Sequence, residues 1–207
     1  MASTIKRQTL EITEKLFPGI RFSMPSGDGT IYITFDDGPH PGSTPRLLEL
    51  LAKYNACATF FCLGRNVEKY PAVYDSIIAA GHAVGNHTWS HPNGWTTSTS
   101  RYMEDVDRAS GVINSRLFRP PYGRITSGQY RQLRKHFDII MWTWQFADYR
   151  PGFNPGKINL NRIQPGDILV MHDTPESVSR TLEVVERIMG LNFGSSCNVI
   201  PQMIQRN

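Results

Sequence analysis

Cysteine is scarce in this chain, and a strong net charge and long apolar runs are missing as well. The 207 residues include three cysteines, Cys57, Cys62 and Cys197, and an odd number argues against a complete disulfide framework. Cys57 and Cys62 lie in one predicted strand on opposite faces, so we expect them to stay unpaired thiols. Their spacing does not suit a structural zinc site either.

No apolar stretch reaches the length of a transmembrane helix, so we expect no membrane span. The segment Met1–Pro18 also holds no apolar run long enough for a signal peptide. Taken literally, the sequence predicts a cytoplasmic protein. A chain whose leader had been removed would look the same and would belong to the cell envelope.

The net charge is mild, +4 at pH 7, and it is spread along the chain. The densest basic stretch, Arg131, Arg134 and Lys135, is typical of a solvated helix face, so we expect no nucleic-acid partner. A weak attraction to anionic wall polymers is compatible with this charge. Nothing in the sequence indicates an oligomeric state.

The composition is that of an ordinary globular domain, with 40% hydrophobic and 19% charged residues. Its length suits one α/β domain, and we find no repeat and no low-complexity linker. We interpret residues 1–29 as an N-terminal lead-in segment that ends in the loop Met24–Gly29. Residues 30–207 are then a single domain.

Within this domain, short apolar runs alternate with helical patterns, which predicts a parallel α/β sheet. One helix is expected to begin at Ser43 or Thr44, with Pro45 in its first turn. The predicted strands favour an incomplete barrel, with an open sheet as the alternative. They are Ile31–Asp36, Cys57–Cys62, Ala83–Asn86, Leu117–Arg119, Asp138–Thr143, Asp167–His172 and Asn198–Ile200.

Polar side chains stand at or just past the ends of these strands. This is the edge where parallel α/β folds build active sites. Core packing does not explain why five separate segments bring reactive groups to one rim. The residues concerned are the pair Asp36-Asp37, His87, Arg119, Asp148 and His172.

Two of these segments have the chemistry of a metal site. In Asp36-Asp37-Gly38-Pro39 a turn can present one acid to a cation and leave the other free as a base, although a solvated turn is the alternative. His87 and His91 are at i and i+4, which on a helical turn lets both imidazoles reach one ion. Two histidines and one carboxylate leave positions open for water and substrate.

With these residues in place, the sequence resembles the polysaccharide deacetylases of the NodB-homology group, carbohydrate esterase family 4. The resemblance covers residues 31–189, and the five family motifs appear in order. TFDDGP is complete at Thr34–Pro39, H-[ST]-x-x-H is complete at His87–His91, and R-x-P-Y matches Arg119–Tyr122. The fifth motif, L-x-H, has valine for leucine at Val170–His172. The family fold is a distorted (β/α)₇ barrel with its active site at the C-terminal strand ends.

The resemblance implies a role for each residue. Asp37, His87 and His91 would bind one divalent metal ion. Zinc is the first choice, and cobalt, nickel or manganese also suit this donor set. Asp36 would be the general base and His172 the general acid in the hydrolysis of an N-acetyl group.

Further residues would support this chemistry. Arg119 would orient Asp36 and keep it ionised, and Asp148 would raise the basicity of His172. The substrate would meet Pro121, the backbone amide of Tyr122 as oxyanion donor, and Trp142 and Val170 as walls of the acetyl pocket, with a place in the core as the alternative for these last two.

The fourth motif departs from the family pattern, usually D-x-x-D-W. Gln145 replaces its first acid and Tyr149 its tryptophan, while Asp148 is kept. We interpret these changes as altered substrate recognition. The expected partner is an acetylated glycan that contains N-acetylglucosamine. The alternatives are a related hydrolase of a small linear or cyclic amide, and a catalytically inactive carbohydrate-binding protein.

Overall fold

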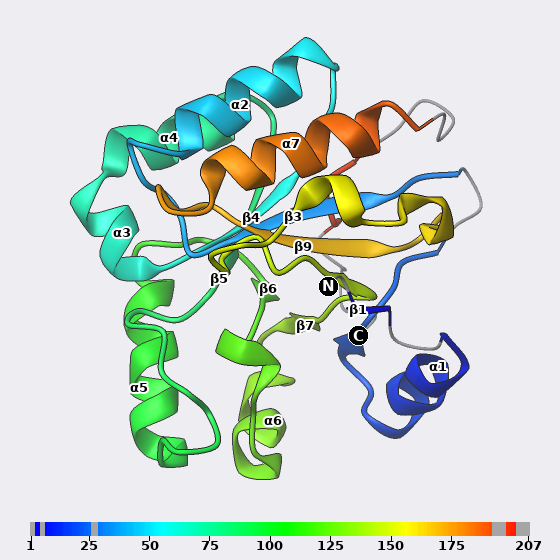
Figure 1. The fold of residues 1–207 in the computed structure, drawn as a ribbon. Helices are drawn as coiled ribbons and strands as arrows, with labels where there is room; N and C mark the ends of the chain where they lie inside the picture. Colours follow the sequence, from blue (N-terminus) through cyan, green and yellow to red (C-terminus); the bar gives the residue numbers. More distant parts are fainter. Residues whose placement is uncertain (1–2, 5–6, 26–28, 192–197, 202–207) are drawn as a thin grey trace.

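A computed structural model of the chain describes residues 3–4, 7–25, 29–191 and 198–201. Within these residues, the strands form one nine-stranded sheet with the order β1-β8-β9-β3-β4-β5-β6-β7-β2 (Figure 1). The strands are β1 Ser3–Thr4, β2 Ile20–Arg21, β3 Tyr32–Asp36, β4 Thr59–Cys62, β5 Ala83–Asn86, β6 Leu117–Phe118, β7 Asp138–Ile140, β8 Trp144–Gln145 and β9 Ile168–His172.

Neighbouring strands run parallel, except that β1 is antiparallel to β8. The sheet curls into a half-barrel with helices around it, so the predicted distorted (β/α)₇ barrel is confirmed. At its centre, β3 and β9 pair over five positions, from Tyr32 opposite Ile168 to Asp36 opposite His172.

The helices lie outside the curled sheet. They are α1 Arg7–Leu16, α2 Thr44–Lys53, α3 Gly64–Lys69, α4 Pro71–Ala79, α5 Thr99–Ser110, α6 Ser127–Leu133 and α7 Val178–Met189. In Figure 1, α2, α4 and α7 cover β3, β4 and β9, whereas α5 and α6 lie beside β5, β6 and β7. Each helix that follows a parallel strand returns the chain to the edge of the sheet where the strands begin. The C-terminal ends of the parallel strands therefore lie together at the other edge.

The core follows the two-residue alternation of the strands. Ile33 and Phe35 of β3 pack under the outer helices, with Leu47 and Leu51 of α2. Tyr32 points to the inside of the half-barrel, where further strand residues cluster: Phe61, Leu117, Ile140 and Ile168. A third cluster joins α5 and α6 to β6 and β7.

Four elements differ from the sequence prediction. Asn198–Ile200, predicted as a strand, is irregular: the Asn198 N–H donates to the Ile31 carbonyl at 3.3 Å, but the Ile200 N–H donates to the Thr59 hydroxyl instead of a backbone carbonyl. The short strands β1, β2 and β8 were not predicted. β2 pairs with β7 at one edge of the sheet and β1 pairs with β8 at the other. The division of the chain at residue 29 stays a prediction.

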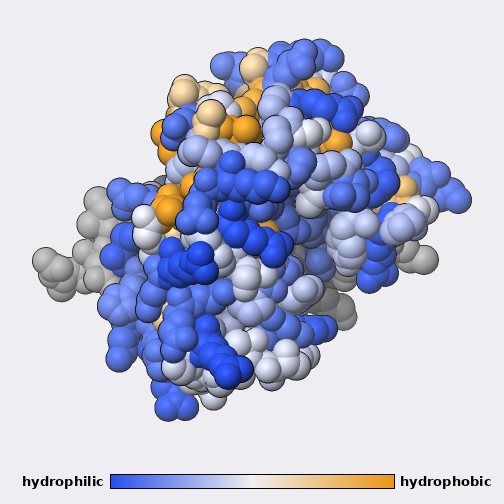
Figure 2. All heavy atoms as spheres, turned by 90° about the vertical axis from the view of Figure 1, so that its left-hand side faces the viewer, coloured by the Kyte–Doolittle hydropathy of each residue, from blue (hydrophilic) through white to orange (hydrophobic). Residues whose placement is uncertain are grey.

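Cys57 and Cys62 are free thiols, as expected, and Cys197 lies outside the described residues. Within the described part of the chain, every helix is too short or too polar to cross a membrane. Figure 2 shows a largely hydrophilic face, with hydrophobic side chains gathered in its upper part.

Candidate metal-binding and catalytic site

The predicted site residues converge at the C-terminal edge of the sheet. Asp36 ends β3 and lies opposite His172, which ends β9. His87 follows β5 and Arg119 follows β6, and these strands are also neighbours. Parallel pairing therefore brings side chains from distant parts of the sequence to one rim.

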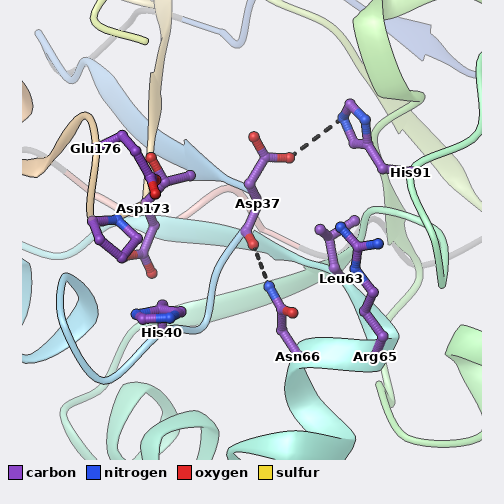
Figure 3. A pocket seen from close by; sticks show the side chains of 10 residues that line it. Asp37, His40, Leu63, Arg65, Asn66, His91, Asp173 and Glu176 are labelled. Carbon is purple, nitrogen blue, oxygen red and sulfur yellow. Dashed lines mark hydrogen bonds and ion pairs between the residues drawn. The ribbon is translucent and has the colours of Figure 1, made fainter.

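Asp37, His87 and His91 form a compact group of three possible ligands. One ligand atom from each residue can be chosen so that all lie within 4.8 Å of one another. Asp37 Oδ1 is 3.6 Å from Nε2 of His87 and 3.3 Å from Nε2 of His91 (Figure 3 draws the second contact). The three side chains thus converge on a space that one ion can occupy.

The donor chemistry fits a cation. Asp37 Oδ1 is buried and has no hydrogen-bond partner among the described residues. Burial lowers the pKa of both His87 and His91, which favours neutral rings with a free lone pair. An unsatisfied carboxylate oxygen that faces two neutral imidazoles is costly in isolation, and a divalent ion would satisfy all three groups.

The two histidines come together through a turn, so the prediction of a helical turn was wrong. Residues 87–91 are not helical, and both Thr88 and His91 have positive φ values, 70° and 66°. Asp105 of α5 fixes this turn, because its carboxylate accepts hydrogen bonds from the backbone N–H groups of Trp89 and Ser90 at 2.7 and 2.9 Å. Asp37 also has a positive φ, 78°. Backbone strain therefore gathers at the candidate ligands.

Asp36 lies beside this group in a buried ion pair. Its Oδ1 accepts a hydrogen bond from Nη1 of Arg119 at 2.8 Å, and its Oδ2 lies 4.0 Å from Nε2 of His87. Burial alone would raise the pKa of Asp36, but the nearby positive charges, Arg119 first among them, together outweigh burial and hold that pKa below its usual value. The carboxylate is therefore ionised near neutral pH.

Arg119 is fully buried and its guanidinium is held on every side. It donates to the Thr34 hydroxyl at 2.6 Å and to the backbone carbonyls of Ile140 and Met141. It also lies 4.0 Å above the Phe61 ring. These contacts fix the guanidinium in one position, so it orients the Asp36 carboxylate.

His172 and Asp148 form a second buried pair on the other side of Asp36. Nδ1 of His172 is 2.7 Å from Oδ1 of Asp148, whose second oxygen accepts from the His172 backbone N–H and the Thr181 hydroxyl. Burial lowers the pKa of His172, but the hydrogen bond and charge of Asp148 overcome this and raise the pKa to about 9. The ring is therefore protonated at neutral pH. Tyr149, in place of the family tryptophan, meets that ring at 4.8 Å, edge to face.

The residues expected to meet substrate differ in how they lie relative to the ligand group. The Tyr122 ring is exposed and meets the His91 ring at 4.5 Å. Trp142 is half-buried against Gly123, where a Cβ would come within 2.6 Å of its ring. Pro121 and Val170 are buried. Val170 shares its face of β9 with His172, two positions along, so it lies below the rim.

A cleft of about 310 Å³ opens on the other side of Asp37 (Figure 3). Asp37 and His91 form part of its wall. The other lining residues are His40, Leu63, Arg65, Asn66, Asp173, Thr174, Pro175 and Glu176. None of these eight residues was predicted to belong to the site.

Asp173 is the most consequential of these missed residues. It is buried, and its carboxylate accepts hydrogen bonds from the hydroxyls of Ser43 at 2.5 Å and Thr44 at 2.6 Å. Ser43 stands at the N-cap of α2 as predicted, but its side chain makes no capping bond. A Cβ on Gly38 would lie 2.2 Å from Oδ2 of Asp173, so this carboxylate packs directly against the turn that carries Asp37.

The chain is similar to proteins of known family. A family model described as polysaccharide deacetylase matches residues 23–139. A peptidoglycan-N-acetylglucosamine deacetylase of Bacillus cereus is 34% identical over 164 residues, which are 74% of this chain and 59% of that protein's length. A chitooligosaccharide deacetylase of Azorhizobium caulinodans is 34% identical over 154 residues, 70% of this chain and 73% of that protein.

The fold is similar to that in a crystal structure of the Bc1960 peptidoglycan N-acetylglucosamine deacetylase in complex with 4-naphthalen-1-yl-N-oxidanyl-benzamide. The TM-score is 0.85 with 29% sequence identity, over 94% of this chain and 97% of that chain.

Proposed function

Because the chain belongs to the polysaccharide deacetylase family, we propose that it is a metal-dependent hydrolase that removes N-acetyl groups from a glycan containing N-acetylglucosamine. The products are acetate and the free amine of the sugar. The observation that carries the proposal is the unsatisfied Asp37 carboxylate oxygen, which faces His87 and His91.

Asp37, His87 and His91 would hold the ion. When bound, a divalent ion supplies a Lewis acid that lowers the pKa of a water molecule and polarises an acetyl carbonyl. The three side chains leave further coordination positions open, as a catalytic site requires. Zinc is our first candidate, and this donor set also suits cobalt, nickel or manganese.

Asp36 takes a proton from the attacking water. Its carboxylate is ionised by Arg119 and fixed next to the ligand group, so it needs no rearrangement before it accepts a proton. A positioned general base of this kind contributes roughly 10²–10⁴-fold in rate. The new bond joins the water oxygen to the acetyl carbon.

His172 gives a proton to the departing nitrogen as the carbon–nitrogen bond breaks. Its raised pKa, which follows from Asp148, keeps it protonated until this step. β9 and β3 are adjacent, so acid and base approach the acetyl group from neighbouring strands. By the family resemblance, the Tyr122 backbone amide is our candidate oxyanion donor, and the Tyr122 ring borders His91.

The test is acetate release from a set of defined substrates, measured on chelated protein with and without added divalent ions. The set holds acetylated chitooligosaccharides, peptidoglycan fragments, small linear acetamides and a cyclic imide. Metal-dependent release from glycans supports the proposal. Turnover of the small amides alone would replace it with the amidase alternative, and no turnover of any substrate would favour the inactive carbohydrate-binding protein.

A further inference from the structure

An exposed tryptophan and an arginine extend the rim beyond His91. Trp95, in the segment between β5 and α5, leaves 65% of its surface exposed. The Arg124 guanidinium lies 4.7 Å from the Trp95 ring and 5.9 Å from the Tyr122 ring. Tyr122 in turn meets His91. A continuous run of flat groups therefore leads from a candidate metal ligand to Trp95.

The backbone around Trp95 is held firmly. Gln129 is fully buried, and its side-chain amide donates to the carbonyls of Gly94 at 2.9 Å and Thr97 at 3.0 Å. A Cβ on Gly94 would lie 2.2 Å from the backbone oxygen of Arg124, so the two segments pack backbone against backbone. A buried amide thus fixes a loop whose largest side chain faces solvent. Core packing gains nothing from this arrangement.

Arg124 carries a charge that no carboxylate of the described residues neutralises. Among the described residues no carboxylate lies within ion-pair distance of its guanidinium, which the two rings hold in place. A planar guanidinium can bind a carboxylate through two hydrogen bonds, and a stacked one loses little freedom when it does so. An exposed indole offers a flat apolar surface to the face of a sugar ring.

We propose that Trp95 and Arg124, the Trp95–Arg124 platform, bind the sugar residue next to the one that loses its acetyl group, and that Arg124 favours a sugar carrying a carboxylate. This inference rests on the proposed deacetylase function and narrows its substrate to an acidic wall-type glycan. Trp95 supplies the stacking surface common to all glycans. Arg124 supplies the preference for acidic ones.

The test measures binding of two oligosaccharides of equal length to chelated protein by titration calorimetry, so that no turnover occurs. One is neutral, built only of N-acetylglucosamine, and the other alternates N-acetylglucosamine with N-acetylmuramic acid. Trp95→Ala and Trp95→Leu should each weaken binding of both by about tenfold. Arg124→Gln should weaken the acidic oligosaccharide by about tenfold and leave the neutral one within about twofold.

Tyr54→Ala and Lys53→Gln are matched controls. They change another exposed aromatic–cation pair, at the C-terminal end of α2, where the ring and the ammonium are 5.3 Å apart. Both controls should bind like the wild type. Raising the salt concentration should weaken only the acidic oligosaccharide, and only while Arg124 is present.

Three results would overturn the platform: wild-type protein that binds neither oligosaccharide, Trp95 variants that bind both like the wild type, or an Arg124→Gln variant that loses both equally. The last would make Arg124 a support for the Trp95 ring. Failure of the proposed function is distinguishable, because a protein that releases no acetate from either oligosaccharide can still show these binding differences.

Discussion

The backbone carbonyl of Arg119 accepts a hydrogen bond from Nδ1 of His87 at 2.7 Å. Because burial keeps His87 neutral, this contact places its single ring proton on Nδ1 and leaves the Nε2 lone pair facing Asp37. The side chain of Arg119 holds Asp36 at the same time. One residue therefore sets the tautomer of a candidate ligand and the charge of the candidate base.

The first prediction concerns metal binding by Asp37, His87 and His91. Chelated protein should take up one equivalent of Zn²⁺, and the double variant His87→Ala, His91→Ala should weaken binding more than about 100-fold, since even outer contacts of ligands cost 10–100-fold. Titration calorimetry and metal analysis measure this. His136→Ala removes an exposed histidine away from the site and should bind like the wild type. Unchanged metal content in the double variant would rule out the assignment.

Asp36→Asn should keep the metal and lose activity by roughly 10²–10⁴-fold, because an amide cannot accept the proton from water. It should also lower the free energy of unfolding by about 3–5 kcal/mol, because Arg119 would stay charged and buried without its carboxylate. Metal content, acetate release and urea unfolding measure the three effects. If Asp36→Asn lost metal while Asp37→Asn kept it, the roles of the two acids would be reversed.

Gly38→Ala tests the packing of Asp173 against the Asp37 turn. The new Cβ would come within 2.2 Å of the Asp173 carboxylate, so either that group or the turn must move. We expect a loss of about 1–3 kcal/mol in unfolding free energy, together with weaker metal binding. In an Asp173→Ala background the cost of Gly38→Ala should fall by at least about 0.5 kcal/mol.

Gly190→Ala is the control for this cycle. Gly190 has an ordinary helical φ of −73°, and among the described residues beyond its chain neighbours no heavy atom lies closer than 3.6 Å to an added Cβ. It should change stability by less than about 0.5 kcal/mol. Strictly additive effects of Gly38→Ala and Asp173→Ala would show that the two positions do not act on each other.

The strands that carry the site were predictable because their apolar runs are long enough to show a pattern. Six of the seven predicted strands are present, as β3, β4, β5, β6, β7 and β9, and all but β5 have shifted ends. β2 and β8 have two residues each, too few for any periodicity, and their neighbours β7 and β9 determine them. Only the assembled sheet shows that the lead-in segment supplies β2.

The motif residues come together as predicted, but their local geometry could not be predicted from the sequence. The i, i+4 spacing of His87 and His91 is the same in a helix and in the observed turn, which depends on positive φ at Thr88 and His91. The partners of Asp173 lie 130 and 129 positions away in sequence, so no local pattern indicates those contacts. Trp95 was not predicted as a site residue, because the role of an exposed aromatic depends on neighbours that only the structure shows.

The contact between His172 and Asp148 leads to a prediction for how the rate of amide hydrolysis falls at alkaline pH. The protonated ring is the proposed proton donor, and the pKa of His172 is raised to about 9. Amide hydrolysis should therefore persist through neutral pH and fall as the pH rises through about 9. In Asp148→Asn the group that raises the pKa of His172 most is lost, while burial still lowers that pKa. The decrease of the hydrolysis rate should therefore move to lower pH by more than about one unit. An unmoved alkaline limb would assign that ionisation to another group.

His172→Ala separates proton donation from binding. An amide nitrogen must be protonated before it leaves, whereas the aryloxide of an activated aryl acetate is already a good leaving group. Without His172 the amide reaction should slow by roughly 10²–10⁴-fold, and its alkaline limb should flatten because the titrating group is gone. The aryl acetate should slow less than about tenfold. Both rates are measured on wild type and variant, with metal content checked in each. Equal losses on the two substrates would show that His172 positions or binds the acetyl group instead of protonating the amine.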